Sequence, residues 1–168
     1  YGLVGSEMCI RDRCAIGRRA GSLSDAPPLE RAIAALRAGR MVRLGQLTIL
    51  SVETASQAML DLVDPQGSAP LLLSGQRARA LSLANEREAA IEEEPVEIRR
   101  TAWLDLEAAR QLADPAQDVG RAPIGPLEAI CVDNPGCARA ALALARRAGL
   151  LPALWLVDSD AAITLEPD

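Results

Sequence analysis

Hydrophobic positions along the chain alternate between helical and extended spacing. Apolar side chains three or four positions apart predict helices over residues 29–38, 57–63, 76–83, 104–113 and 138–148. Short apolar or alternating runs predict strands over residues 41–44, 47–52, 70–73, 95–100 and 154–157, with a last extended piece at 162–165. This order of elements predicts an α+β fold, with a mixed sheet surrounded by helices.

Turn and capping residues mark several element ends. Residues 45–46, Gly-Gln, join the first two strands as a tight hairpin. Either Thr54 or Ser56 is placed to cap the helix at 57–63. We predict a turn at 134–136, Asn-Pro-Gly, and a long loop over 114–126, which is rich in Pro, Gly and Asp.

Composition narrows the function classes. The chain has 168 residues, 49% of them hydrophobic and 24% charged, which fits one ordinary globular domain. It contains no His, so proton shuttles, nucleophile pairs and metal sites that depend on imidazole are excluded. All 18 basic residues are Arg, dispersed among 23 acidic residues for a net charge of -5, which argues against nucleic-acid binding. No apolar run is long enough for a membrane span, and we expect a cytoplasmic protein.

Cysteines and acidic runs offer weak metal or redox candidates. Cys131 and Cys137 lack the close pairing of a zinc site, and we interpret them as buried or incidental thiols. A thiol enzyme using them is disfavoured because the chain has no His, Lys or CxxC partner. The glutamates at 92–94 fit either a divalent metal or a solvated surface, and we favour the surface. Trp103 and Trp155 are assigned to core or edge packing.

The N-terminal segment stands apart from this pattern. Residues 3–13, LVGSEMCIRDR, resemble one translated frame of a transposon adapter used in sequencing libraries. The alternative is a natural N-terminal segment. We interpret residues 1–21 as an artefactual or disordered leader, and residues 22–168 as the domain.

Several later segments resemble 3,4-dihydroxy-2-butanone 4-phosphate synthase, a riboflavin-pathway enzyme that converts ribulose 5-phosphate with Mg²⁺. The matching segments are LERAIAALRAGRMVRL at 29–44, SVETAS at 51–56, PLLLSGQRARALSL at 70–83 and the helix ending in Ala-Asp-Pro at 106–115. The most specific match is GxxxAAxxLAxxAGLxPA at 136–153. The resemblance implies that family's fold for a single synthase-like domain.

The chemistry implied by this resemblance is missing from the chain. The family's acidic loop, which carries a Mg²⁺ ligand, is replaced by the two residues 45–46, and its Gly-His-Thr-Glu becomes Gly-Cys-Ala-Arg at 136–139. Glu53, Cys137 and Arg139 are therefore vestigial candidates only. We expect no catalytic residue, no cofactor and no metal on this chain.

A fold kept without its site is typical of a pseudoenzyme, and it resembles the N-terminal half of certain alphaproteobacterial GTP cyclohydrolase II proteins. We expect a non-catalytic synthase-like domain of a riboflavin-biosynthesis protein, a homodimer that supports a GTP cyclohydrolase II domain missing from these residues. In that view the chain is a truncated fragment of a hydrolase acting on GTP, and the zinc belongs to the missing domain. A free-standing protein remains the other possibility.

The alternative function is a residual sugar-phosphate enzyme or binding domain that takes ribulose 5-phosphate through Glu53, Cys137 and Arg139. Against it, Cys137 is interpreted as a small packing residue, Arg139 as solvated and Glu53 as part of a surface pair.

Overall fold

The computed structural model describes residues 28–83, 94–120 and 125–158 and gives them an α+β fold. Its helices are α1 (Pro28–Arg37), α2 (Gln57–Val63), α3 (Gly75–Ala80), α4 (Leu106–Ala113), the 3-10 turn η2 (Pro115–Gln117) and α5 (Pro135–Arg147). Its strands are β1 (Val42–Leu44), β2 (Leu47–Ser51), β3 (Leu71–Leu73), β4 (Val96–Ile98), β5 (Ala129–Cys131) and β6 (Ala153–Leu156). The expected leader, the glutamates at 92–93 and the extended piece at 162–165 lie outside the described residues.

The strands form one six-stranded sheet in the order β1-β2-β6-β3-β4-β5, and every neighbouring pair is antiparallel. The expected mixed sheet is therefore wrong for the described part of the chain. The reason is the position of β6. Strands β2 and β3 run in the same direction, but β6 returns from α5 and lies between them, pairing Leu50 and Leu71 with the same residue, Trp155.

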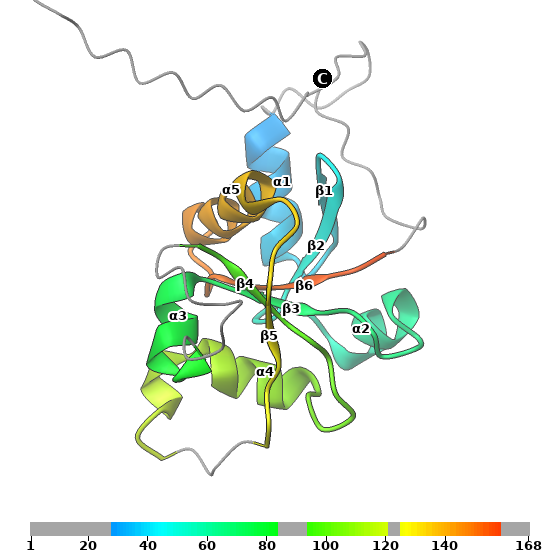
Figure 1. Ribbon diagram of the computed structural model, residues 1–168. Helices are drawn as coiled ribbons and strands as arrows, with labels where there is room; N and C mark the ends of the chain where they lie inside the picture. The colour runs from blue at the N-terminus through cyan, green and yellow to red at the C-terminus, as the bar shows by residue number, and fades with distance from the viewer. Residues whose placement is uncertain (1–27, 84–93, 121–124, 159–168) are drawn as a thin grey trace, which may run out of the picture.

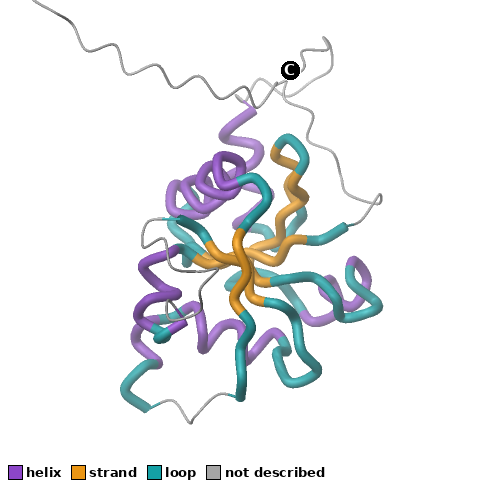
Figure 2. The backbone as a smooth tube through the Cα atoms, in the orientation of Figure 1, coloured by secondary structure: helices purple, strands orange, loops and turns teal. Residues whose placement is uncertain are grey.

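Helices cover both faces of the sheet. Figures 1 and 2 show α1 and α5 side by side on one face, and α2, α3 and α4 on the other. We call these the α1/α5 layer and the α2–α4 layer. Successive strand residues face opposite sides, so Leu72 and Leu154 pack toward the α1/α5 layer while Leu71, Leu73 and Trp155 pack toward the α2–α4 layer.

Polar side chains fix the starts of four helices. Ser56, Ser74, Asp105 and Asn134 each accept a hydrogen bond from the backbone N–H three residues ahead. Of the two candidate caps for α2, Ser56 is therefore the one used. Asn134 and the proline after it begin α5, so the turn predicted at 134–136 is the first part of that helix.

Strand β5 was not predicted from the sequence. Its three residues form antiparallel pairs with β4, matching Ile130 to Glu97 and Cys131 to Val96. The apolar run at 127–132 carried a signal, but its exposed Glu128 and Cys131 broke the alternation expected of a half-buried strand. The 3-10 turn η2 lies within the loop predicted at 114–126, and the other strands and helices lie within a few residues of their predicted ranges.

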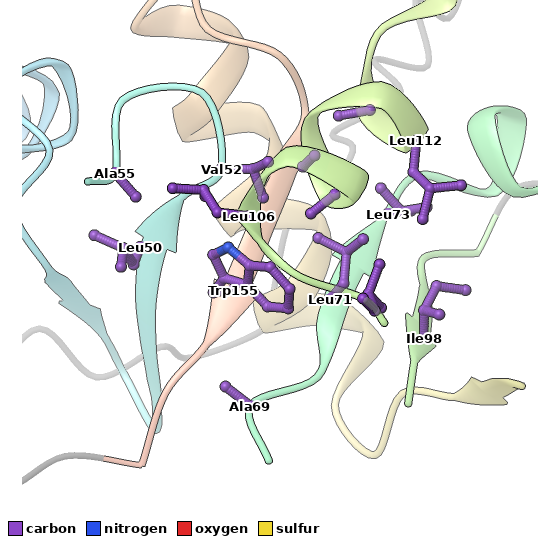
Figure 3. Packing of buried hydrophobic residues seen from close by; sticks show 14 of the residues in the cluster. Leu50, Val52, Ala55, Ala69, Leu71, Leu73, Ile98, Leu106, Leu112 and Trp155 are labelled. Atoms are coloured by element: carbon purple, nitrogen blue, oxygen red, sulfur yellow. The ribbon is translucent and has the colours of Figure 1, made fainter. Parts of the chain in front are cut away.

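Trp155 lies at the centre of the larger core. Its side chain is fully buried, and Figure 3 shows it beside Leu50, Val52, Leu71 and Leu106. These neighbours come from β2, the turn after it, β3 and α4. The interpretation of Trp155 as a packing residue is confirmed, whereas Trp103 is only partly buried against the same core.

Candidate functional site

Glu53 lies in the turn after β2, at one end of the sheet. Its side chain is exposed, and its Oε2 accepts a hydrogen bond of 2.7 Å from the backbone N–H of Leu151. In the described structure this carboxylate binds a backbone N–H and does not form the expected surface ion pair. Glu53 instead joins the turn after β2 to the segment between α5 and β6.

The rest of the SVETAS segment is held by similar bonds. Thr54 Oγ1 donates to the Leu36 carbonyl at 2.6 Å. From α4, Arg110 donates to the carbonyls of Val52 at 3.2 Å and Ala55 at 2.7 Å. This segment therefore links α1 and α4, which cover opposite faces of the sheet.

Cys137 lies in the first turn of α5 and is 8% exposed. Its backbone N–H donates to Asn134 Oδ1 at 3.1 Å as part of the helix cap. The interpretation of Cys137 as a small, buried packing residue is confirmed.

Arg139 lies one half-turn further along α5 and is exposed. Its Nη1 donates to both carboxylate oxygens of Glu94, at 2.6 Å each. The expected solvated side chain is thus an ion-paired one, and its charge is offset by a carboxylate. Because both partners are partly exposed, the pair contributes little to stability, about 0.2–1 kcal/mol.

The three candidate residues do not come together. Cys137 and Arg139 lie in the first turns of α5, whereas Glu53 contacts Leu151, beyond the last turn of the same helix. From Cys137 and Arg139, ten and eight residues of helix lead to Arg147, the last residue of α5, which is a rise of about 12–15 Å. Glu53 therefore contacts the chain at the opposite end of α5 from the other two, and the three side chains do not converge on one point.

Glu97 lies in β4, between the buried Val96 and Ile98, and its side chain is half-buried. It lies on the sheet face that the α1/α5 layer covers, opposite Leu72 on one neighbouring strand and Ile130 on the other. Burial raises the pKa of Glu97, and the negative charge of Asp133 raises it further.

Within the described ranges, no three cysteine or acidic side chains are grouped so as to hold a metal ion.

Two buried polar clusters were missed by sequence reasoning. In the first, Asp64 at the end of α2 accepts hydrogen bonds from the backbone N–H groups of Ser68 at 2.8 Å and Ala69 at 2.9 Å. Arg100 completes it with a 2.6 Å ion pair to Asp64, and its guanidinium lies 4.8 Å from the centre of the Trp155 ring. From the sequence, Asp64 was only the residue after the helix predicted at 57–63. No local sequence pattern indicated a contact with Arg100.

The second cluster surrounds Arg77 on α3, whose side chain is only 6% exposed. Its guanidinium donates to both carboxylate oxygens of Asp118, at 2.6 and 2.7 Å, and its Nε donates to the Leu112 carbonyl. This fork holds the chain that follows α4 against α3. The first cluster joins the loop after α2 to the segment after β4, the second joins α3 to the chain after α4, and neither resembles a set of acid and base groups around a substrate.

No protein-family model matches the chain, and comparison with curated proteins found no significant match. Over the ranges that the structure describes, no helix has both the length and the apolar character needed to cross a bilayer.

Proposed function

We propose that this chain is a non-catalytic domain similar to 3,4-dihydroxy-2-butanone 4-phosphate synthase, which dimerises and supports a GTP cyclohydrolase II domain in riboflavin biosynthesis. Its place would be the cytoplasm. The proposal rests on the sequence segments that resemble the synthase and on the motifs that depart from it at 45–46 and 136–139.

The separation of Glu53 from Cys137 and Arg139 carries the non-catalytic part of the proposal. A general acid or base must lie within hydrogen-bond reach of the reacting group, and a metal needs several ligands around one point. Here Glu53 accepts from a backbone N–H, Arg139 is paired with Glu94 and Cys137 is buried in a helix cap. Each candidate has a role in holding the fold.

The supporting role is favoured by how the SVETAS segment is used. Its side chains and carbonyls bond to α1, α4 and the segment after α5. Such bonds make this end of the sheet rigid, which suits a domain that presents a fixed surface to another.

Sedimentation velocity of the full chain, alone and mixed with a GTP cyclohydrolase II domain, tests the proposal. We expect a dimer alone and a larger complex in the mixture, at micromolar concentrations. A monomer that forms no complex would contradict it.

An assay for turnover of ribulose 5-phosphate in the presence of Mg²⁺ distinguishes the proposed function from the alternative, a residual sugar-phosphate enzyme. We expect none above buffer. Any turnover that Glu53→Gln or Arg139→Gln abolishes, while the exposed controls Glu107→Gln and Arg99→Gln retain it, would favour the alternative.

A further inference from the structure

Four exposed arginines gather where α1 and α5 end. Arg37 is the last residue of α1, Arg40 follows within one turn, and Arg146 and Arg147 are the last residues of α5. The helix ends are side by side because Arg37 Nε donates to the Ala148 carbonyl at 2.7 Å. We call these four residues the arginine end.

Charge at the arginine end is not offset by ion pairs. Among the described residues, no carboxylate lies within ion-pair distance of any of the four. Elsewhere in the described chain, Arg77, Arg99, Arg100, Arg110 and Arg139 have such a partner, whereas the exposed Arg43 donates to the Gly45 carbonyl instead. Glu53, which contacts the segment after α5, accepts a hydrogen bond from the Leu151 N–H.

Helix capping explains the position of only one of these four arginines, Arg37. Cations are stabilising at helix carboxyl ends, and Arg37 caps α5 directly. No hydrogen bond of this kind involves the side chains of Arg40, Arg146 or Arg147 within the described ranges. Helix α5 carries no acidic residue at all, and the exposed side chains between its arginines are alanines, which leave the guanidinium groups accessible.

A carboxylate-rich protein surface fits this end better than nucleic acid does. Base stacking needs aromatic side chains, and Trp103 and Trp155 both pack with the α2–α4 layer, on the other face of the sheet. The net charge of -5 also opposes a polyanion as dense as nucleic acid. Guanidinium forks pair well with carboxylates, and arginine is enriched in protein interfaces.

A second copy of the chain fits less well. Asp105, Glu107 and Asp114 lie on or beside α4, in the opposite layer, and Glu30 lies in the first turn of α1, away from its arginine end. Contact between them and the arginine end of another copy would be head to tail, which extends into chains of molecules unless the rotation closes a ring.

We propose that the arginine end, formed by Arg37, Arg40, Arg146 and Arg147, is a docking surface for a carboxylate-rich surface of a different protein. This inference deepens the proposed function, since it rests on the domain having a partner and names the chemistry of the contact.

Fluorescence anisotropy of the full chain with a labelled glutamate-rich peptide tests the docking surface, and an oligothymidylate of equal net charge is the comparison. The test variant is Arg146→Gln with Arg147→Gln, which leaves the Arg37 cap intact. The control is Arg79→Gln with Arg99→Gln, two exposed arginines outside the arginine end, with the same change in net charge. We expect the test variant to weaken peptide binding about fivefold at low salt and the control to change it less than twofold.

Equal weakening by both variants, no peptide binding, or tighter binding of the oligothymidylate would each overturn the docking surface. Titration of both variants with a GTP cyclohydrolase II domain separates this inference from the proposed function. If that domain binds wild type and test variant equally, the proposed function stands and the arginine end fails. If the peptide binds through Arg146 and Arg147 but the domain does not bind, the docking surface stands and the proposed partner fails.

Discussion

The two helical layers differ in what they do with charge. In the α2–α4 layer, Arg77 and Arg100 turn inward and are buried in ion pairs. In the α1/α5 layer the core side chains are aliphatic, with alanines at Ala138, Ala141 and Ala145 of α5, and the arginines face outward. The α2–α4 layer buries two of its arginines in ion pairs, whereas Arg37 and Arg139 of the α1/α5 layer make their contacts at the surface.

Loop length explains this difference. Residues 64–70 of the α2–α4 layer connect α2 to β3 without regular structure, and buried backbone N–H groups there need acceptors. Asp64 supplies them for Ser68 and Ala69. Helices α1 and α5 satisfy their own backbone groups and need only a smooth apolar face, which alanine and leucine provide.

Replacing Asp64 tests the buried pair and has the largest expected effect. Asp64→Ala leaves Arg100 buried without its carboxylate and removes the side-chain acceptors of two backbone N–H groups, those of Ser68 and Ala69. We expect a loss of about 3–5 kcal/mol in the free energy of unfolding, measured by urea denaturation. Asp61→Ala, an exposed acid on α2, is the control and should cost less than about 1 kcal/mol. Equal losses would show that Arg100 and Asp64 contribute no more than a surface pair.

The sequence predicted the regular elements of both layers well. Helical spacing located α1 and α5, and Gly45 with Gln46 predicted the β1–β2 hairpin. These features depend on residues close together along the chain, so local patterns are sufficient. Gly39, directly after the helix predicted at 29–38, has a φ of +66°, a conformation that glycine adopts readily at helix ends.

Contacts between distant residues were beyond the same reasoning. Because β6 lies between β2 and β3, the sheet is antiparallel and not mixed as expected. Arg100, after β4, forms an ion pair with Asp64, which follows α2. Glu53 and Arg139 were grouped because the family resemblance grouped them, yet Glu53 contacts the chain beyond the opposite end of α5 from Arg139. Such pairings depend on topology, which the spacing of single residues does not encode.

Replacing Arg77 tests whether the second cluster resembles the first. Arg77→Met keeps the apolar stem but leaves the Leu112 carbonyl and Asp118 without these hydrogen bonds. We expect a loss of about 2–3 kcal/mol, less than for Asp64→Ala because Asp118 is 33% exposed and regains water. Arg79→Met, at an exposed position on the same helix, should cost under about 1 kcal/mol, and the two are compared by urea denaturation.

Enlarging an alanine tests the packing of the α1/α5 layer. Ala141 is fully buried on α5, so Ala141→Leu must displace its neighbours. We expect a loss of about 1–2 kcal/mol, seen as a lower thermal midpoint. Ala143→Leu, on the exposed side of the same helix, should leave the midpoint nearly unchanged. If Ala141→Leu is equally silent, the layer is packed more loosely than its aliphatic character implies.

Glu97 is the position where the α1/α5 side of the sheet departs from its aliphatic character, and it gives the smallest expected effect. Burial and then Asp133 raise its pKa above the ordinary value of 4.5, so the folded state favours the protonated carboxyl. Its stabilising contribution is therefore complete below that ordinary value and is lost as the pH rises through the raised one.

Glu97→Gln removes this titration, because the amide stays neutral. The variant should be more stable than wild type at pH 7, and the gain should vanish toward pH 4, where Glu97 is protonated. Thermal midpoints at both pH values measure the effect, with Glu128→Gln as the exposed control from the segment leading into β5. A gain that is the same at both pH values would mean that hydrogen bonding by the amide, and not loss of the buried charge, stabilises the variant.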